Sequence, residues 1–128
     1  MKDFKKYYTL SATPEEIYTA LTNPLTLELW TGEEAVMSTE PGSEFSLWGG
    51  SISGKNLEFE QDKKIVQQWY FDGEPETSIV TIKLHPGKNH TTSVELRHTN
   101  IPDREYEDFA SGWDDSYFGA LTDFFGDN

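Results

Sequence analysis

The chain has 128 residues, a length that predicts one domain (1–128) with a hydrophobic core of its own. It contains no cysteine, which excludes disulfides, thiolate metal sites and a cysteine nucleophile. Its formal charge of −13 disfavours nucleic acids and anionic membranes as partners, because both repel an acidic protein. No apolar signal segment opens the sequence and no apolar run is long enough to span a membrane, so we expect a cytoplasmic protein.

The first thirty residues predict one strand followed by two short helices. Apolar and polar side chains alternate over residues 4–10, as they do in a half-buried strand. Thr13 and Glu16 have the spacing of a capping box, and Pro14 stands at the first helical position between them. The apolar face of this helix holds Ile17, Ala20 and Leu21. The pair Asn23-Pro24 ends it and begins a second helix that reaches Trp30.

The middle of the chain predicts a meander of six strands separated by turn signals. The strands are expected at 36–39, 44–48, 51–60, 63–71, 77–85 and 91–99. Turns are expected at 41–42, 49–50, 72–73 and 86–87, and a bulge at Gly54. The connections are too short for parallel crossovers, so the sheet must be antiparallel.

The stretch from Asp103 to Phe125 predicts a long amphipathic helix. At about 100° per residue, one mostly aromatic stripe collects Tyr106, Phe109, Ala110, Trp113, Tyr117, Ala120, Leu121 and Phe124. Phe118 and Phe125 flank the stripe, while Gly112 and Gly119 fall on the polar back. At roughly 1.5 Å per residue the helix would be about 33 Å long, and its stripe needs a large apolar partner surface.

These elements predict an α+β fold with a curved antiparallel sheet of about seven strands. An open sheet of that size curls because of its twist. The terminal helix is the element able to fill the concave side. We therefore predict a helix-grip fold of order β-α-α-β6-α, in which the sheet wraps around the C-terminal helix and two short helices follow the first strand.

Four strings in this order resemble the START-like superfamily, also called SRPBCC or birch-pollen-allergen-like. They are Thr13–Trp30, Pro41–Trp69, Thr92–Pro102 and Ser111–Leu121. Within the superfamily, the sequence is most similar to the family named after the C-terminal domain of the activator of the 90-kDa heat-shock-protein ATPase. Two positions depart from the family pattern: Ser43, where a second glycine is common, and Tyr70, where a basic residue often follows the tryptophan.

The resemblance implies the helix-grip fold and leaves three functions open. Relatives in the superfamily bind small hydrophobic molecules between helix and sheet, which is the function we favour here. Some relatives catalyse cyclisation or dehydration in that space. The chaperone activator itself has a further N-terminal domain with a signature rich in Asn, Trp and His, and no such signature occurs in these residues. A chaperone-associated interaction protein, meeting its partner through an acidic outer surface, is therefore the alternative.

A set of mostly apolar and aromatic side chains is expected to surround the cavity. The members are Trp30, Ile65, Gln67, Trp69, Phe71, Val80, Ile82, Leu84, Leu96, His98, Trp113 and Tyr117. Aromatic walls with one or two polar groups are typical of small-molecule pockets. The competing interpretation is that these rings simply fill the core, where each buried side chain contributes roughly 1.5–3 kcal/mol.

His98 is the polar member of an inward-facing row on the last strand. Side chains alternate along a strand, which puts Val94, Leu96 and His98 on one face. An imidazole near the cavity can hold a ligand or transfer a proton near neutral pH, as a cyclase or hydratase would require. The alternative is a structural histidine whose hydrogen bonds are satisfied by Trp113 or Tyr117 of the covering helix.

Other polar clusters do not predict a catalytic or metal site. Asp114 and Asp115 are neighbours on a helix and point about 100° apart, so we expect a solvated face. His85 and His90 flank a turn without a nearby carboxylate, which makes an incomplete metal site. No established catalytic or nucleotide motif occurs. We expect no cofactor, a non-enzymatic role, and a monomer or a weak homodimer through an unpaired edge strand.

Overall fold

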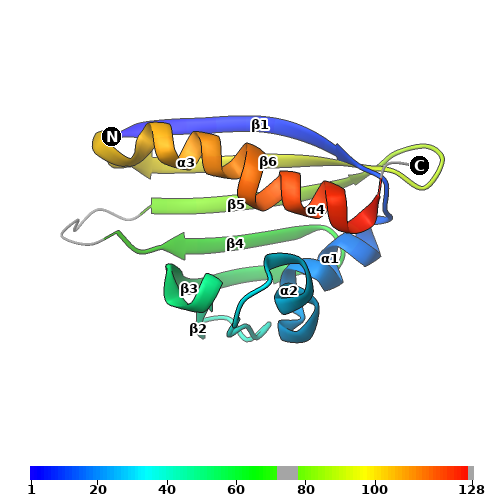
Figure 1. Ribbon diagram of the computed structural model, residues 1–128, viewed down its shortest axis with the longest axis horizontal. Coiled ribbons are helices and arrows are strands. Elements are labelled where there is room, and N and C mark those ends of the chain that lie inside the picture. The colour runs from blue at the N-terminus through cyan, green and yellow to red at the C-terminus, as the bar shows by residue number, and fades with distance from the viewer. Residues whose placement is uncertain (72–77, 127–128) are drawn as a thin grey trace.

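The computed structural model describes residues 1–71 and 78–126 (Figure 1). Its elements follow the predicted order of one strand, two helices, further strands and a terminal helix. They are β1 (Lys2–Leu10), α1 (Pro14–Thr22), α2 (Pro24–Thr31), β2 (Glu44–Leu47), η1 (Trp48–Gly50), β3 (Ile52–Glu60), β4 (Lys64–Trp69), β5 (Ser78–Pro86), β6 (Thr92–Ile101), η2 (Asp103–Glu105), α3 (Tyr106–Gly112), η3 (Trp113–Tyr117) and α4 (Phe118–Phe125).

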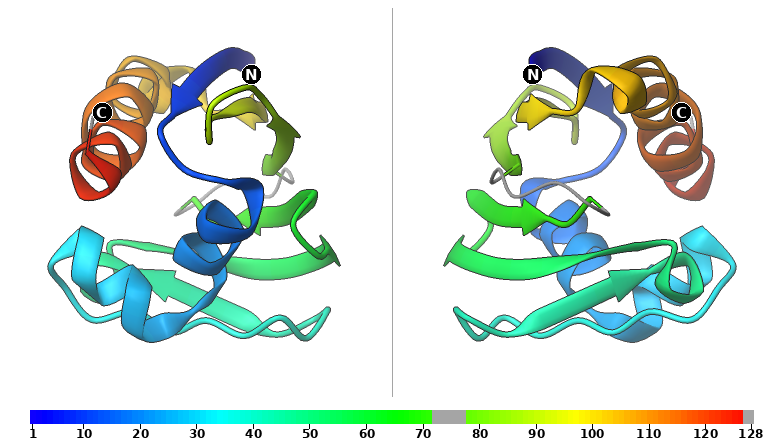
Figure 2. Two further views of the ribbon diagram at one scale, coloured as in Figure 1. Left: turned by 90° about the vertical axis from the view of Figure 1, so that its right-hand side faces the viewer. Right: turned by 90° about the vertical axis from the view of Figure 1, so that its left-hand side faces the viewer.

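The six strands form one antiparallel sheet in the order β1-β6-β5-β4-β3-β2. Figure 2 shows this sheet curling from β1 to β2, with the terminal helix lying on its concave side. α2 contacts α4, so the two short helices and the terminal helix share that side. The predicted α+β helix-grip fold is confirmed. In the described part of the chain, no helix is long and apolar enough to cross a membrane.

The sheet differs from the prediction in its number of strands and in the place of its bulge. The expected strand at 36–39 is a single bridge between Val36 and Ser46, so the sheet has six strands. The bulge lies between Asn56 and Glu58. Gly54 instead allows the backbone of the neighbouring strand to approach closely, because a Cβ at this position would overlap the carbonyl oxygen of Gln68. The predicted turn at 72–73 and the first residue of the strand at 77–85 lie outside the described residues.

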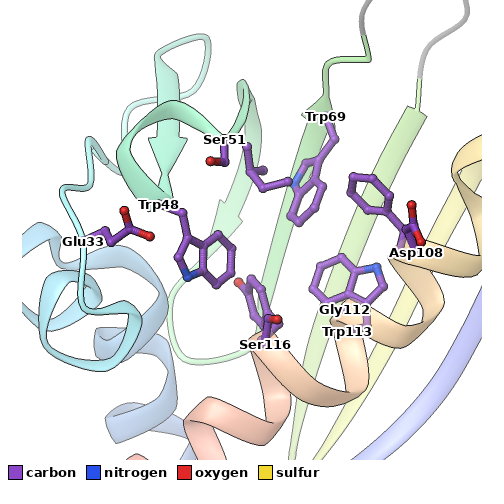
Figure 3. Close-up of a pocket in the computed structure, with 11 residues that line it drawn as sticks. Glu33, Trp48, Ser51, Trp69, Asp108, Gly112, Trp113 and Ser116 are labelled. Carbon is purple, nitrogen blue, oxygen red and sulfur yellow. The ribbon is translucent and has the colours of Figure 1, made fainter.

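The connection between β2 and β3 is longer than the predicted two-residue hairpin. It contains the short η1 turn, in which Trp48, Gly49 and Gly50 all have positive φ angles. Trp48, with φ of 53°, is a bulky residue in the left-handed region, which such residues rarely adopt. This conformation places its indole beside the concave side of the sheet (Figure 3).

The two short helices begin as the sequence predicts. The backbone N–H of Glu16 donates to Thr13 Oγ1 at 3.2 Å, and Thr13 N–H donates to Glu16 Oε1 at 2.9 Å. Asn23 Oδ1 accepts from the next helix, from Leu25 N–H at 3.0 Å and Thr26 N–H at 3.1 Å. These caps satisfy backbone donors that have no partner inside a helix. They fix the sharp change of direction between α1 and α2.

A π turn interrupts the long helix predicted over 103–125. η3 separates α3 from α4, and the backbone N–H of Phe118 donates to the carbonyl of Trp113, five residues earlier. Such a turn holds one residue more than an α-helical turn, so it rotates every following side chain about the helix axis. A Cβ on Gly119 would lie 2.7 Å from the carbonyl oxygen of Asp114, which explains the glycine there.

The extra residue changes which side chains face the sheet. Phe118, predicted to flank the apolar stripe, is 1% exposed. Phe124, predicted inside the stripe, is 40% exposed, so that prediction is wrong. The prediction assumed uninterrupted α-helical spacing, and the π turn breaks this spacing ahead of Phe124. Leu121 remains buried, as predicted.

Asp114, at the π turn, connects the terminal helix to the edge strand β1 through two hydrogen bonds. Its Oδ1 accepts from Lys6 Nζ at 2.7 Å and from the Tyr8 hydroxyl at 2.8 Å. The Tyr8 ring also stacks on Phe118, with ring centroids 4.2 Å apart. Asp114 and Asp115 are both exposed, as predicted for a solvated face.

Candidate functional site

A pocket of about 360 Å³ opens between the terminal helix, the η1 turn and the adjoining ends of β3 and β4 (Figure 3). It is lined by Glu33, Trp48, Ser51, Ile52, Trp69, Asp108, Phe109, Gly112, Trp113, Ser116 and Tyr117. This volume falls within the range of roughly 300–1,000 Å³ that is usual for small-molecule sites. The pocket lies where the sequence predicts one, between the terminal helix and the curved sheet.

Aromatic rings from different elements form the wall of the pocket. Trp69 of β4 and Trp113 of the helix are stacked, with centroids 4.8 Å apart and planes at 29°. The Tyr117 ring lies 4.6 Å from Trp113, and its centroid is 6.1 Å from that of Trp48. Trp69, Trp113 and Tyr117 are buried and Trp48 is half-buried. The wall therefore consists mainly of π faces and ring edges.

A chain of buried amides holds the Trp69 indole in place. Trp69 Nε1 donates to Gln67 Oε1 at 3.0 Å, and Gln67 Nε2 donates to Asn56 Oδ1 at 3.0 Å. Asn56 Nδ2 then donates to the Ser38 carbonyl and to Ser43 Oγ, both at 3.1 Å. Buried polar groups paired in this way favour one arrangement, since any other leaves a donor or acceptor unsatisfied. Ser43, a departure from the family pattern, is thus a member of this network.

His98 holds the second indole. Trp113 Nε1 donates to His98 Nδ1 at 3.1 Å. Because Nδ1 accepts, the neutral imidazole carries its proton on Nε2 and donates it to Ser78 Oγ at 2.8 Å. Ser78 Oγ in turn donates to the Thr99 carbonyl at 3.0 Å.

His98 is fully buried, and this burial lowers its pKa to about 3, so the ring is neutral at physiological pH. Both ring nitrogens have partners within the protein, and His98 is not among the residues that line the pocket. The arrangement matches the structural alternative, with Trp113 as one of the partners named for it. It leaves neither nitrogen available for proton transfer to a molecule in the pocket.

The structure divides the predicted cavity residues into two groups. Trp69, Trp113 and Tyr117 line the pocket. The others lie outside its lining: Trp30, Ile65, Gln67, Phe71, Val80, Ile82, Leu84, Leu96 and His98. All of this second group except Phe71 are buried, and they support the pocket from within the core. Trp30 is one such support, because its Nε1 donates to the Ala20 carbonyl at 2.8 Å and its ring packs against Tyr117.

Several lining residues are absent from the sequence prediction. Trp48 enters the wall through its left-handed backbone, and the neighbouring Gly49-Gly50 pair is the only sequence signal of that turn. Phe109 lay within the predicted helical stripe but not in the predicted cavity. The sequence does not predict the inward orientation of Asn56, which lies outside the pocket, because a bulge expected at Gly54 conceals it. Its burial is complete.

The rim of the pocket is acidic. Glu33 follows α2 and Asp108 lies on α3, and both side chains are exposed. Figure 3 shows the two carboxylates at opposite sides of the pocket, with the indoles of Trp48, Trp69 and Trp113 between them. Among the described residues that line the pocket, none is Lys, Arg or His. The neutral polar groups of the lining include the hydroxyls of two serines.

The described residues contain no group of three or more His, Cys, Asp or Glu side chains that could hold a metal ion. Contrary to the prediction, each of the two histidines of the β5–β6 hairpin has a carboxylate nearby, but the two carboxylates are different. His85 Nε2 lies 3.1 Å from Glu95 Oε1, and His90 Nε2 lies 3.8 Å from Glu16 Oε1. They therefore do not converge on a common site.

Comparison with known sequences identifies curated relatives over most of the chain. The human activator of 90 kDa heat shock protein ATPase homolog 1 is 30% identical over 119 residues, which are 92% of this chain and 35% of that protein. The Dictyostelium discoideum homolog is 33% identical over 114 residues, covering 88% of this chain and 30% of that protein. The chain thus spans about a third of the length of these relatives.

Solved structures share the fold over nearly their whole length. An HSP90 activator from Plasmodium falciparum has a TM-score of 0.87 and 28% identity, covering 97% of this chain and 96% of that one. The Aha1 dimer from Colwellia psychrerythraea has a TM-score of 0.82 at 20% identity, which shows a common fold. The family model described as Activator of Hsp90 ATPase homolog 1-like protein matches residues 11–126. The chain therefore belongs to the Activator of Hsp90 ATPase homolog 1-like family, a START-like (SRPBCC) family.

Proposed function

We propose that this protein binds a 90-kDa heat-shock protein and changes the rate at which that chaperone hydrolyses ATP. The observation that carries the proposal is the similarity to the Plasmodium falciparum protein described as an HSP90 activator. That alignment covers 96% of the Plasmodium chain at a TM-score of 0.87, so the likeness extends over nearly the whole of that chain. A chaperone partner also agrees with the cytoplasmic location that the sequence predicts.

The proposed contact includes an exposed apolar pair on α2. Leu25 and Leu29 are 74% and 72% exposed, and they lie one helical turn apart on the same face. A contiguous apolar surface in contact with water is unfavourable, and such surfaces often mark sites of protein contact. Neither leucine lines the aromatic pocket, so this surface can be tested separately from the pocket.

Calorimetric titration against a purified 90-kDa heat-shock protein tests this proposal. We expect saturable binding by the wild type and at least tenfold weaker binding by the double variant Leu25→Ser/Leu29→Ser. Val36→Ser is the control, because Val36 is also an exposed apolar side chain, at 56%, but lies outside α2. Absence of binding by the wild type would overturn the proposal. Unchanged binding by the double variant would remove α2 from the contact, and equal loss in the control would show that the effect is not specific to α2.

A second function is favoured by the pocket itself: binding of a small apolar or aromatic molecule. The pocket has about 360 Å³ of space beside two stacked indoles. Each indole N–H is already bound to a buried acceptor, Gln67 or His98, so the wall is arranged before any ligand arrives. Pre-organisation lowers the entropic cost of binding, which supports this function.

A fluorescence screen with lipids and flavonoid-like molecules tests the second function. Ligands in the pocket should quench tryptophan emission and shift the indole N–H signals of Trp69 and Trp113 in NMR spectra. Gly112→Leu should prevent this, because Gly112 lines the pocket and a Cβ there meets no atom within 4 Å. Ser111→Leu, an exposed neighbouring position outside the lining, is the matched control. Ligands that bind both variants equally would show that the pocket is not the site.

A further inference from the structure

We infer that the aromatic pocket selects organic cations, in which an ammonium group is joined to an apolar or aromatic body. The inference rests on the proposed small-molecule function of the pocket and adds the chemical class of the ligand. It is carried by the combination of aromatic side chains that line the pocket and carboxylates on its rim.

The aromatic wall of the pocket favours a cationic ligand. The face of an indole or phenyl ring carries negative electrostatic potential, and tryptophan attracts a cation best. Three indoles, Trp48, Trp69 and Trp113, line this one pocket together with two further rings, Phe109 and Tyr117. The rings come from the η1 turn, β4 and the terminal helix, so they surround the space from several sides (Figure 3). An ammonium group between them would meet more than one ring.

The charged side chains among the described lining residues are acidic. Glu33 and Asp108 stand on opposite sides of the rim, and no cationic side chain is present among the described lining residues. A carboxylate ligand, such as a fatty acid, would meet two negative charges without a compensating positive one. A neutral aromatic molecule would bind the rings without using the rim. An organic cation is attracted both by the rings and by the rim carboxylates. Its apolar body also buries surface in the pocket.

The overall charge of the protein adds to this preference. The formal charge of −13 raises the local concentration of cations and repels anions at low ionic strength. This general attraction does not by itself specify a site, because it acts over the whole surface. The test must therefore separate the two rim carboxylates from the remaining acidic residues.

A pair of probes with one shape and different charge provides the first arm of the test. Phenyltrimethylammonium carries a quaternary nitrogen where tert-butylbenzene carries a carbon, so the two fill the same space. Binding is measured by tryptophan fluorescence and by the indole N–H signals in NMR spectra. At low salt we expect phenyltrimethylammonium to bind about tenfold more tightly than tert-butylbenzene, a ratio typical of cation–π and rim attraction.

Two double variants with the same change of net charge provide the second arm. Glu33→Gln/Asp108→Asn should reduce the preference for the cation to less than about threefold. Glu34→Gln/Glu107→Gln should keep it, because both positions are exposed neighbours of the rim residues but lie outside the pocket lining. Tert-butylbenzene should bind both double variants as it binds the wild type.

Three outcomes would overturn the inference. Equal binding of the two probes by the wild type would overturn the inference and leave the small-molecule function in place. Failure of both probes to move the indole signals, while a lipid or flavonoid-like molecule does move them, would overturn the inference alone; failure of all of these molecules would overturn the small-molecule function as well. Equal loss of the preference in the two double variants would show only general attraction to an acidic surface, which also overturns the inference.

Discussion

The indole N–H of Trp113 on the terminal helix donates to Nδ1 of His98 on β6, the strand beside the edge strand β1, across 3.1 Å. The bond joins the helix to the sheet inside the core and fixes the tautomer of the imidazole. Gln67 Oε1 accepts from the Trp69 indole N–H at 3.0 Å, and both residues lie on β4. Two buried polar residues thus hold the two stacked rings of the pocket wall, and neither lines the pocket itself.

The stability of the protein should fall with acid because His98 is buried neutral. The folded state holds the pKa of His98 at about 3, whereas an unfolded histidine has a pKa near 6.5. Between these values the unfolded chain binds a proton that the folded chain excludes, so lowering the pH favours unfolding. The contribution of His98 to the free energy of unfolding is fully present above pH 6.5. Below that pH it declines by up to about 1.4 kcal/mol per pH unit.

Urea unfolding of the wild type and of His98→Gln over pH 4 to 7 measures this contribution. The carboxylates contribute alike to both proteins, so the difference between the two slopes isolates His98. We expect the wild type to lose stability with falling pH more steeply than the variant. Parallel slopes would mean that the histidine is protonated in the folded protein.

Asn56→Ala should destabilise the protein by about 1–3 kcal/mol, because it leaves the buried amide of Gln67 without its acceptor. The change should also shift the Trp69 indole N–H signal, since Gln67 is its partner. Gln68→Ala is the control, because Gln68 lies beside Gln67 on β4 but is only half-buried. Urea unfolding and NMR spectra together check the prediction. A stability change no larger than that of the control would refute a role for the network.

Alanine at the two helical glycines should have opposite effects. Gly112→Ala should stabilise the protein by roughly 0.5–1 kcal/mol, because alanine is the better helix former and its Cβ meets no atom within 4 Å. Gly119→Ala should destabilise it, since the Cβ would lie 2.7 Å from the Asp114 carbonyl oxygen. Thermal unfolding of the two variants measures the difference. Equal stabilisation would mean that the π turn relaxes to regular helix without cost.

Asp114→Asn should have a small effect although its carboxylate has two donors. The bonds from Lys6 and Tyr8 lower the pKa of Asp114, so its contribution is present at neutral pH and lost in acid. The Asp114 side chain is 42% exposed, however, and exposed ion pairs contribute at most about 1 kcal/mol. Urea unfolding at low and high salt checks this. A loss of stability well above that limit would show that the two hydrogen bonds from β1 to Asp114 strengthen each other.

Local patterns predict most of the fold because they depend on residues close together in the chain. The capping box at Thr13 involves contacts within one helical turn, and the alternation of Val94, Leu96 and His98 needs only strand geometry. The π turn at Trp113–Tyr117 is different. A periodicity of 3.6 residues conceals it, and the close approach of the Asp114 carbonyl to Gly119 that accompanies it exists only once the helix is built.

The pocket is predicted less completely because its wall is made by segments distant in sequence. Trp69, Trp113 and Tyr117 follow from strand and helix parity. Glu33 and Asp108 share a rim only because α2 and α3 stand on the same side of the sheet, which no local pattern specifies. Trp48 depends on a left-handed backbone that its own residue type disfavours.

The ATP hydrolysis rate of a 90-kDa heat-shock protein, titrated with this protein, tests the central functional claim most directly. We predict a saturable change in the rate, which Leu25→Ser/Leu29→Ser abolishes and Val36→Ser preserves. A rate that stays constant across the titration, at concentrations where calorimetry shows the chaperone fully bound, would contradict that claim.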